Sequence, residues 1–121
     1  MSDKPRILLI DDNPGMLETL SDILSSYGFE VDTAASGHEA IQLFESHTYN
    51  VAVVDIIMPG MNGVEVIHRM KPKHPGTRFI VITAYTDSEL ARQAREEQVA
   101  GILYKPVDPD RLIKLVQEHA A

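Results

Sequence analysis

Short apolar runs alternate with amphipathic stretches along the whole chain. Five runs have the length of β-strands, and they cover 6–10, 29–35, 51–54, 79–82 and 102–104. Four of them are apolar almost throughout, which is typical of strands buried on both faces of a parallel sheet. The run at 29–35 instead alternates apolar and polar residues, which indicates a strand with one wet face at an edge of the sheet.

Between these runs, apolar residues recur at three- and four-residue spacing, which predicts amphipathic helices. The first helix is predicted to begin at Asn13-Pro14, with Asp12 or Asn13 as its N-cap, and to end at Gly28. The other predicted helices cover 37–44, 64–70, 86–98 and 109–116. Five strands that alternate with five helices predict a doubly wound α/β fold with a five-stranded parallel sheet, and the wet second strand favours the order 2-1-3-4-5.

Length and composition narrow the class of protein. A chain of 121 residues can bury a core by itself, so we expect one domain over 1–121. The absence of cysteine excludes disulfides, thiolate zinc sites and cysteine nucleophiles. No apolar run approaches the roughly 18 residues of a membrane span, and the start of the chain lacks a signal-peptide core, so we expect a cytoplasmic protein without membrane contact.

The charge balance is acidic, with 18 acids against 11 bases and a formal net charge of −7. This argues against direct nucleic-acid binding. It suits a cation site or a basic partner, although solubility alone explains such a balance about as often.

Polar residues stand where the predicted strands end. They are Asp11 and Asp12 after the first run, Asp55 after the third, Thr83 after the fourth and Lys105 after the fifth. The carboxyl ends of parallel strands lie along one edge of the sheet, and ligands bind there beside the point where the strand order reverses. One acid after a strand is usually a turn or cap residue, but four strands that end in such residues by accident are improbable.

Three carboxylates that converge on one crevice repel each other unless a cation or protons intervene. No thiol or imidazole is predicted nearby, since the five histidines fall in helices and connections and are expected to be solvated. The expected ion is therefore Mg²⁺, which prefers oxygen ligands. Thr83 adds a hydroxyl and Lys105 an ammonium, so the set suits phosphoryl transfer, with the carboxylate of Asp55 as the nucleophile.

The chain resembles the receiver domain of two-component response regulators from its first strand to its last helix. The matching residues, in order, are Asp11-Asp12, Asp55 with Met58-Pro59 and Gly63, Thr83-Ala84 and Lys105-Pro106. Each motif alone is weak, but their order and separation are specific. The resemblance implies a flavodoxin-like fold and a phosphorelay function in signal transduction.

The resemblance also implies a role for each acid. Asp55 would accept a phosphoryl group from a phosphohistidine of a sensor histidine kinase or phosphotransfer protein. Asp12 and Asp55 would ligate Mg²⁺ directly together with the backbone carbonyl of Ile57, and Asp11 would act largely through water. The domain would then be a signalling phosphoacceptor and not an enzyme with external substrates.

The resemblance implies that the remaining matching positions bind the phosphoryl group and respond to it. Thr83, Lys105 and the backbone N–H of Ala84 would bind its oxygens, and the bond before Pro106 is usually cis in the family. The resemblance implies a rearrangement of the face made by the fourth helix, the fifth strand and the fifth helix. That face would contact an output domain or partner protein, and a homodimer is possible.

Two positions depart from the family. Most receivers carry Tyr or Phe where this chain has Ile102, so either Tyr85 or Tyr104 replaces that ring or the switch uses no rotating ring. Ile57 and Tyr85 are bulky where many receivers carry polar or small residues, which predicts slow loss of the phosphoryl group.

Two other functions remain open from the sequence alone. An aspartate-dependent phosphohydrolase would usually need a second acid two residues after the nucleophile, where this chain has Ile57. A binding module that is never phosphorylated would be expected to have lost some of Asp12, Asp55, Thr83 or Lys105.

Overall fold

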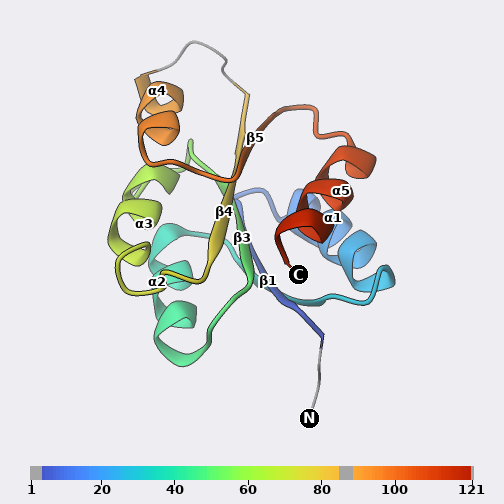
Figure 1. The fold of residues 1–121 in the computed structure, drawn as a ribbon. Helices are drawn as coiled ribbons and strands as arrows, with labels where there is room; N and C mark the ends of the chain where they lie inside the picture. The colour runs from blue at the N-terminus through green and yellow to red at the C-terminus, as the bar shows by residue number, and fades with distance from the viewer. Residues whose placement is uncertain (1–3, 85–88, 121) are drawn as a thin grey trace.

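A computed structural model describes residues 4–84 and 89–120. Strands and helices alternate along the chain (Figure 1). The elements are β1 (Arg6–Ile10), α1 (Pro14–Ser26), β2 (Glu30–Ala34), α2 (Gly37–Ser46), β3 (Val51–Asp55), α3 (Gly63–Met70), β4 (Arg78–Thr83), α4 (Glu89–Glu96), β5 (Gly101–Tyr104) and α5 (Pro109–His119).

The five strands form one parallel sheet in the order β2-β1-β3-β4-β5. The predicted fold class and strand order are therefore confirmed. The expectation that four strands are fully buried is wrong for β5, in which Gly101 and Ile102 are half-buried and Tyr104 is exposed. This strand is the second edge of the sheet, so one of its sides has no neighbouring strand.

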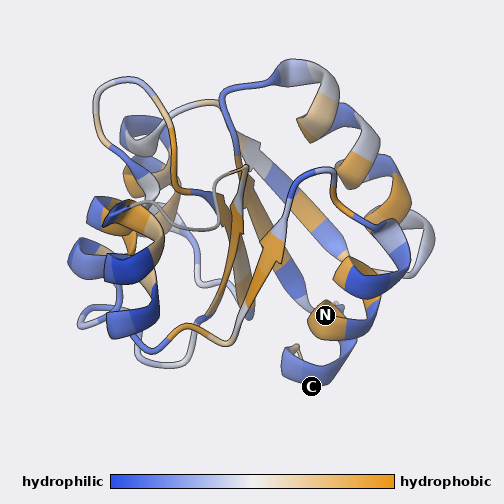
Figure 2. Ribbon diagram, turned by 90° about the horizontal axis from the view of Figure 1, so that it is seen from above, coloured by the Kyte–Doolittle hydropathy of each residue, from blue (hydrophilic) through white to orange (hydrophobic). Residues whose placement is uncertain are grey.

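Helices cover both faces of the sheet (Figure 1). α1 and α5 pack on one face over an apolar cluster that includes Leu24, Val53 and Val116. α2, α3 and α4 pack on the other face over a cluster that includes Phe44, Val54 and Ile67. Figure 2 shows hydrophobic strands in the centre and helices that carry hydrophilic residues outside. Both faces of the central strands are thus buried, which explains their continuous apolar sequence.

Side chains at the helix starts fix where the chain turns from strand to helix. Asn13 caps α1 by accepting a hydrogen bond from the N–H of Met16, so Asn13 and not Asp12 is the N-cap. Ser36, Asn62 and Asp108 cap α2, α3 and α5 in the same way. Asp12 is thereby left without a capping role.

Three expectations change or fall outside the described residues. His68, counted among the positions that indicated the third helix, is 77% exposed at its side chain and contacts Glu97 instead of the core. The predicted start of the fourth helix at 86–88 lies outside the described residues, and α4 ends at Glu96, before the expected 98.

Within the described residues, no helix has the length and apolar character that crossing a membrane requires.

Candidate functional site

The carboxyl ends of β1, β3, β4 and β5 bring the predicted site residues together at one edge of the sheet. Asp11 follows β1, and its N–H donates to the carbonyl of Ala34 at the end of β2 (3.1 Å). Asp55 is the last residue of β3, and the next N–H, of Ile56, donates to Ile82 in β4 (3.2 Å). Hydrogen bonds between neighbouring strands therefore fix the backbone of both acids.

Asp55 is 4% exposed, and each of its carboxylate oxygens has a donor. Oδ1 accepts a hydrogen bond from the N–H of Ile57 (3.0 Å), and Oδ2 accepts one from Nζ of Lys105 (3.1 Å). Gly63, at the start of α3, approaches so closely that a Cβ there would lie 2.6 Å from the carbonyl oxygen of Asp55. Only glycine fits at this point, so α3 holds the end of β3 in place.

Asp11 is also 4% exposed, but its carboxylate has fewer hydrogen-bond donors than that of Asp55. Its Oδ1 accepts a hydrogen bond from the N–H of Asn13 (2.9 Å). Among the described residues, its Oδ2 is buried without a hydrogen-bond partner, although Nζ of Lys105 lies 3.3 Å away at ion-pair distance. Burial raises the pKa of Asp11, with a contribution from the charge of Asp55, and the hydrogen bond from Asn13 and the ammonium of Lys105 offset only part of this rise.

Lys105 is the cation shared by these two acids. Its N–H donates to the carbonyl of Thr83 (2.9 Å), which ties the ends of β4 and β5 together, and the Lys105–Pro106 bond is cis, the isomer that the resemblance led us to expect. Desolvation lowers the pKa of Lys105, but the hydrogen bond to Asp55 and the charges of Asp55 and Asp11 outweigh it, so the pKa is raised. The ammonium is therefore charged at neutral pH.

Asp11, Asp12 and Asp55 form a group of acids that fits a hard cation. One carboxylate oxygen from each lies within 4.8 Å of the others. Asp12 is exposed, whereas the unpartnered Oδ2 of Asp11 is an acceptor buried beside this group. Oxygen ligands, in excess of the one ammonium that the described residues bring near them, are the donor set that Mg²⁺ prefers.

A pocket of about 380 Å³ opens beside the acids. It is lined by Asp12, Asn13, Asp55, Ile57, Ala84 and Lys105. Thr83 is fully buried and does not line the pocket, but its neighbour Ala84 does. Ile57 is 36% exposed and thus presents an apolar side chain at the opening. The pocket is large enough for a phosphoryl group with bound water.

The other predicted positions are more scattered. Ile102 is half-buried against the cluster under α2, α3 and α4, and Tyr104 is 42% exposed. Tyr85 lies outside the described residues. The expectation of five solvated histidines is wrong for three of them: His47, His74 and His119 are half-buried, and the His74 ring packs on Phe44 with centroids 4.9 Å apart.

Sequence reasoning assigned Asn13 only a possible capping role, yet this residue also shapes the site. Its N–H orients the carboxylate of Asp11, and the residue lines the pocket. Its position directly after two acids at a strand end is a signal that could have identified it.

Comparison with known proteins identifies relatives along almost the whole chain. Residues 7–117 match the family described as the response regulator receiver domain. A response regulator receiver protein of Anaeromyxobacter sp. is 36% identical over 91% of this chain and 46% of its own length. A cyclic di-GMP phosphodiesterase of Thermotoga maritima is 34% identical over 94% of this chain and 30% of its own length. The chain thus spans less than half of these two relatives.

Relatives of similar size also match. The sporulation initiation phosphotransferase F of Bacillus subtilis is 27% identical over 94% of this chain and 92% of its own length. Among solved structures, a CheY-like receiver domain protein from Methanospirillum hungatei superposes with a TM-score of 0.91 at 30% identity, over 96% of this chain and 93% of that one.

Proposed function

This chain belongs to the response regulator receiver domain family of two-component systems, and on that premise we propose that Asp55 is its phosphoacceptor. The family is a signalling domain. The proposed donor is a phosphohistidine on a sensor histidine kinase or phosphotransfer protein. The carboxylate of Asp55 forms a bond to phosphorus while the phosphorus–nitrogen bond breaks, and the released imidazole takes up a proton.

The observation that carries this proposal is the arrangement around Asp55. A nearly buried carboxylate at the end of the central strand faces a pocket, with a lysine 3.1 Å from one oxygen. Lys105 can follow the negative charge from the carboxylate to the phosphoryl oxygens, because its ammonium is a point charge on a flexible stem. Ala84 lines the same pocket and offers a backbone N–H, and Thr83 precedes it with a hydroxyl.

Receiver domains bind Mg²⁺ in general, and we propose that Asp12, Asp55 and the carbonyl of Ile57 hold it here, with Asp11 acting largely through water. The excess of oxygen ligands over cations supports this assignment. Held by these residues, Mg²⁺ would neutralise charge on the acids and on the incoming phosphoryl group. Asn13 and Ile57 keep one oxygen of Asp11 and one of Asp55 occupied by backbone N–H groups, which orients both carboxylates.

Phosphorylation adds roughly −1.5 to −2 charges at Asp55. Thr83 and Lys105, already joined through their backbones, would move toward the new oxygens and carry the ends of β4 and β5 with them. The surface of α4, β5 and α5 would then change its affinity for an output domain or partner protein. We also propose that two copies of the chain can form a homodimer.

Incubation with Mg²⁺ and acetyl phosphate, followed by intact-mass measurement, tests the phosphoacceptor. We expect one phosphoryl group per chain, lost in Asp55→Asn and retained in the control Asp22→Asn, which alters an exposed acid of α1. Multiple turnover of acetyl phosphate would indicate a phosphohydrolase. No modification, and no response to beryllofluoride by NMR, would indicate a module that is never phosphorylated.

Ile57 at the pocket opening supports slow loss of the phosphoryl group, because its side chain stands where water must enter. We expect Ile57→Ala to shorten the phosphorylated lifetime, measured by mass after removal of the donor. A wild-type lifetime of seconds, or a longer one in Tyr85→Ala, would contradict a shielding role for these side chains.

A separate proposal concerns the aromatic side chain that takes part in the conformational switch. Tyr104 is exposed beside Ile102, so we propose that Tyr104 or Tyr85 replaces the aromatic residue that most receivers carry at position 102. Phosphorylation-dependent partner binding by Tyr85→Ala and by Tyr104→Ala tests this. Full retention in both variants would exclude a substitute ring.

The rest of the assignment concerns context. We propose that residues 1–121 form a single receiver domain that acts in the cytoplasm and binds no nucleic acid by itself, in line with its net charge of −7. The two longer relatives extend well beyond the region that matches this chain.

A further inference from the structure

α4 buries fewer and smaller apolar side chains than its neighbour α3. Its fully buried residues are Ala91 and Ala94, and Leu90 packs partly buried against the same core, whereas α3 buries Gly63, Val64, Val66, Ile67 and Met70. A buried methyl group contributes only about 0.8 kcal/mol, so apolar packing holds α4 less firmly than α3.

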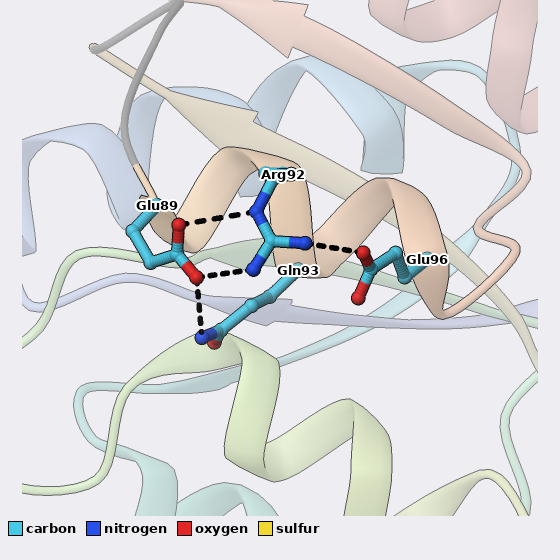
Figure 3. A network of polar contacts seen from close by, with 4 residues as sticks. All are labelled: Glu89, Arg92, Gln93 and Glu96. Carbon is cyan, nitrogen blue, oxygen red and sulfur yellow. Dashed lines mark hydrogen bonds and ion pairs between the residues drawn. The ribbon is translucent and has the colours of Figure 1, made fainter.

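On the exposed face of α4, the polar side-chain contacts among the described residues stay within the helix. Arg92 pairs with Glu89 and Glu96, and Gln93 donates to Glu89 (3.4 Å) (Figure 3). Such contacts stabilise the helix itself. They do not bind it to a neighbouring element.

Between α4 and the other described elements, the polar side-chain contacts lie at the carboxyl end of α4. Nζ of Lys71 donates to the carbonyl of Glu97 and lies 3.5 Å from the carbonyl of Gln98. Nδ1 of His68 lies 3.0 Å from Oε1 of Glu97. Both donors come from the end of α3, where Lys71 is the C-cap residue and His68 belongs to the last turn.

This end of α4 needs an outside partner for two reasons. The last carbonyls of a helix accept no hydrogen bond from N–H groups of the same helix. The helix dipole also favours a cation at this end. Gln98 has φ of +58°, a left-handed conformation that a non-glycine residue adopts only when its surroundings compensate the strain. The ammonium of Lys71 supplies both the charge and the hydrogen bonds.

We propose that Lys71 is a positioning residue that fixes the carboxyl end of α4 to α3, so that the switch turns α4 about Glu97 while its amino end moves. The proposal rests on the function proposed for Asp55, because movement of Thr83 and Ala84 at the preceding strand end drives the rotation. α3 is a firm anchor, since Gly63 packs directly against the backbone of Asp55 and its N–H donates to Ile56 (3.1 Å). The pivot is thus connected to the site it serves.

Amide hydrogen exchange and NMR of the free protein and of the protein with Mg²⁺ and beryllofluoride test the pivot. The amides of Glu97 and Gln98, which donate to Gln93 and Arg95, report on the last turn of α4. In the wild type we expect their protection to be the same in both states, while the signals of Glu89 and Arg92 shift. In Lys71→Met they should exchange at least about tenfold faster in both states, and the beryllofluoride shifts should spread to this end.

Two further variants separate positioning from simple stability. Lys71→Arg keeps a cation with several donors and should restore protection. Lys73→Met removes an exposed lysine of the same segment and should behave as the wild type. Unchanged protection in Lys71→Met, failure of the arginine variant, or wild-type protection at Glu97 that changes with beryllofluoride would each overturn the proposal.

The experiment also distinguishes the two proposals. Saturable beryllofluoride shifts at Asp55 and Ala84 report the phosphoacceptor site independently of α4. If these shifts are absent, the function proposed for Asp55 is wrong. Amide exchange of Glu97 and Gln98 in the free protein still tests whether Lys71 holds the end of α4. If the shifts are present, but without a fixed carboxyl end of α4, only the pivot fails.

Discussion

Two groups of acids on the same sheet differ in how they are compensated. In the Asp32 group, one carboxylate oxygen of Asp32 accepts a hydrogen bond from Tyr49 (2.7 Å) and pairs with Arg6 (3.2 Å). In the Asp55 group, Asp11 and Asp55 share the ammonium of Lys105, and one oxygen of Asp11 has no hydrogen-bond partner within the part of the chain that the structure describes. The first group has donors enough for its one acid, whereas the second has more carboxylates than cations.

The difference separates a structural acid from a site. Burial and the bond to Asp32 raise the pKa of Tyr49, so its phenol stays a neutral donor and the negative charge of Asp32 is matched by the guanidinium of Arg6, although Nε of Arg6 is itself buried without a hydrogen-bond partner among the described residues. The Asp55 group gains stability only from a further cation or from protons. A deficit of positive charge, and not burial alone, is what marks the functional edge of this sheet. Four substitutions test the contrast, from the largest expected effect to the smallest.

Lys105→Met should have the largest effect, because it leaves two nearly buried carboxylates without their shared cation. We expect a loss of about 2 kcal/mol in the free energy of unfolding, less than for a fully buried pair because the side chain of Lys105 is 24% exposed. Urea unfolding measures it. Millimolar Mg²⁺ should recover part of the loss, and a loss that Mg²⁺ leaves unchanged would contradict a cation deficit. Lys73→Met serves as the matched control.

Tyr49→Phe should destabilise the protein by about 1 to 2 kcal/mol, because it removes a buried hydroxyl that donates to a carboxylate. The loss should be the same with and without Mg²⁺, in contrast to Lys105→Met. Tyr27→Phe is the control, since Tyr27 is 54% exposed and should change little. A Mg²⁺-dependent loss in Tyr49→Phe would break the comparison between the two groups.

Asp32→Asn should cost about 1 kcal/mol, because it weakens the charge-assisted bond from Tyr49 and the half-exposed pair with Arg6. Thermal unfolding at neutral pH measures the change. Asp22→Asn, in which an exposed acid of α1 is altered, gives the baseline. A variant as stable as the wild type would show that Asp32 is not better compensated than the acids of the Asp55 group.

Asp11→Asn should have the smallest effect and the opposite sign, a gain in stability of the metal-free protein at neutral pH. The pKa of Asp11 is raised in the folded state, chiefly by burial, so folding favours its protonated form. The penalty is absent below the unfolded pKa of about 3.8 and grows as the pH rises through the higher folded pKa. The gain of Asp11→Asn should therefore appear over that rise and persist at neutral pH.

Unfolding midpoints of wild type and Asp11→Asn in EDTA, measured from acid to neutral pH, check this sign. The gain should shrink when Mg²⁺ is added, because the wild type then gains stability that the variant lacks. A variant that is less stable than the wild type in EDTA at neutral pH would refute the cation deficit at Asp11.

Much of the fold could be predicted from the sequence because burial leaves a local trace. The runs at 51–54 and 79–82 are apolar on both faces, and the run at 29–35 is not, which was enough for the strand order. The same logic failed for 102–104, since a short apolar run is equally compatible with a central strand and with an edge strand.

The candidate site could be predicted only in part. The residues at the strand ends were identifiable, because parallel strands deliver their carboxyl ends to one edge. The contact of His68 and Lys71 with the end of α4 was not, since it joins segments about 26 to 29 positions apart and depends on how two helices lie against each other.

The amino-acid sequence by itself determined which residues arrive at this edge, because the apolar pattern sets the strands, their order and the side on which each one ends. The tertiary structure alone decided how the charges are shared there: Lys105 lies between Asp11 and Asp55, while backbone N–H groups occupy one oxygen of each acid. Hydrogen-bond partners are chosen over distances of a few ångströms between distant parts of the chain, and no local pattern records them.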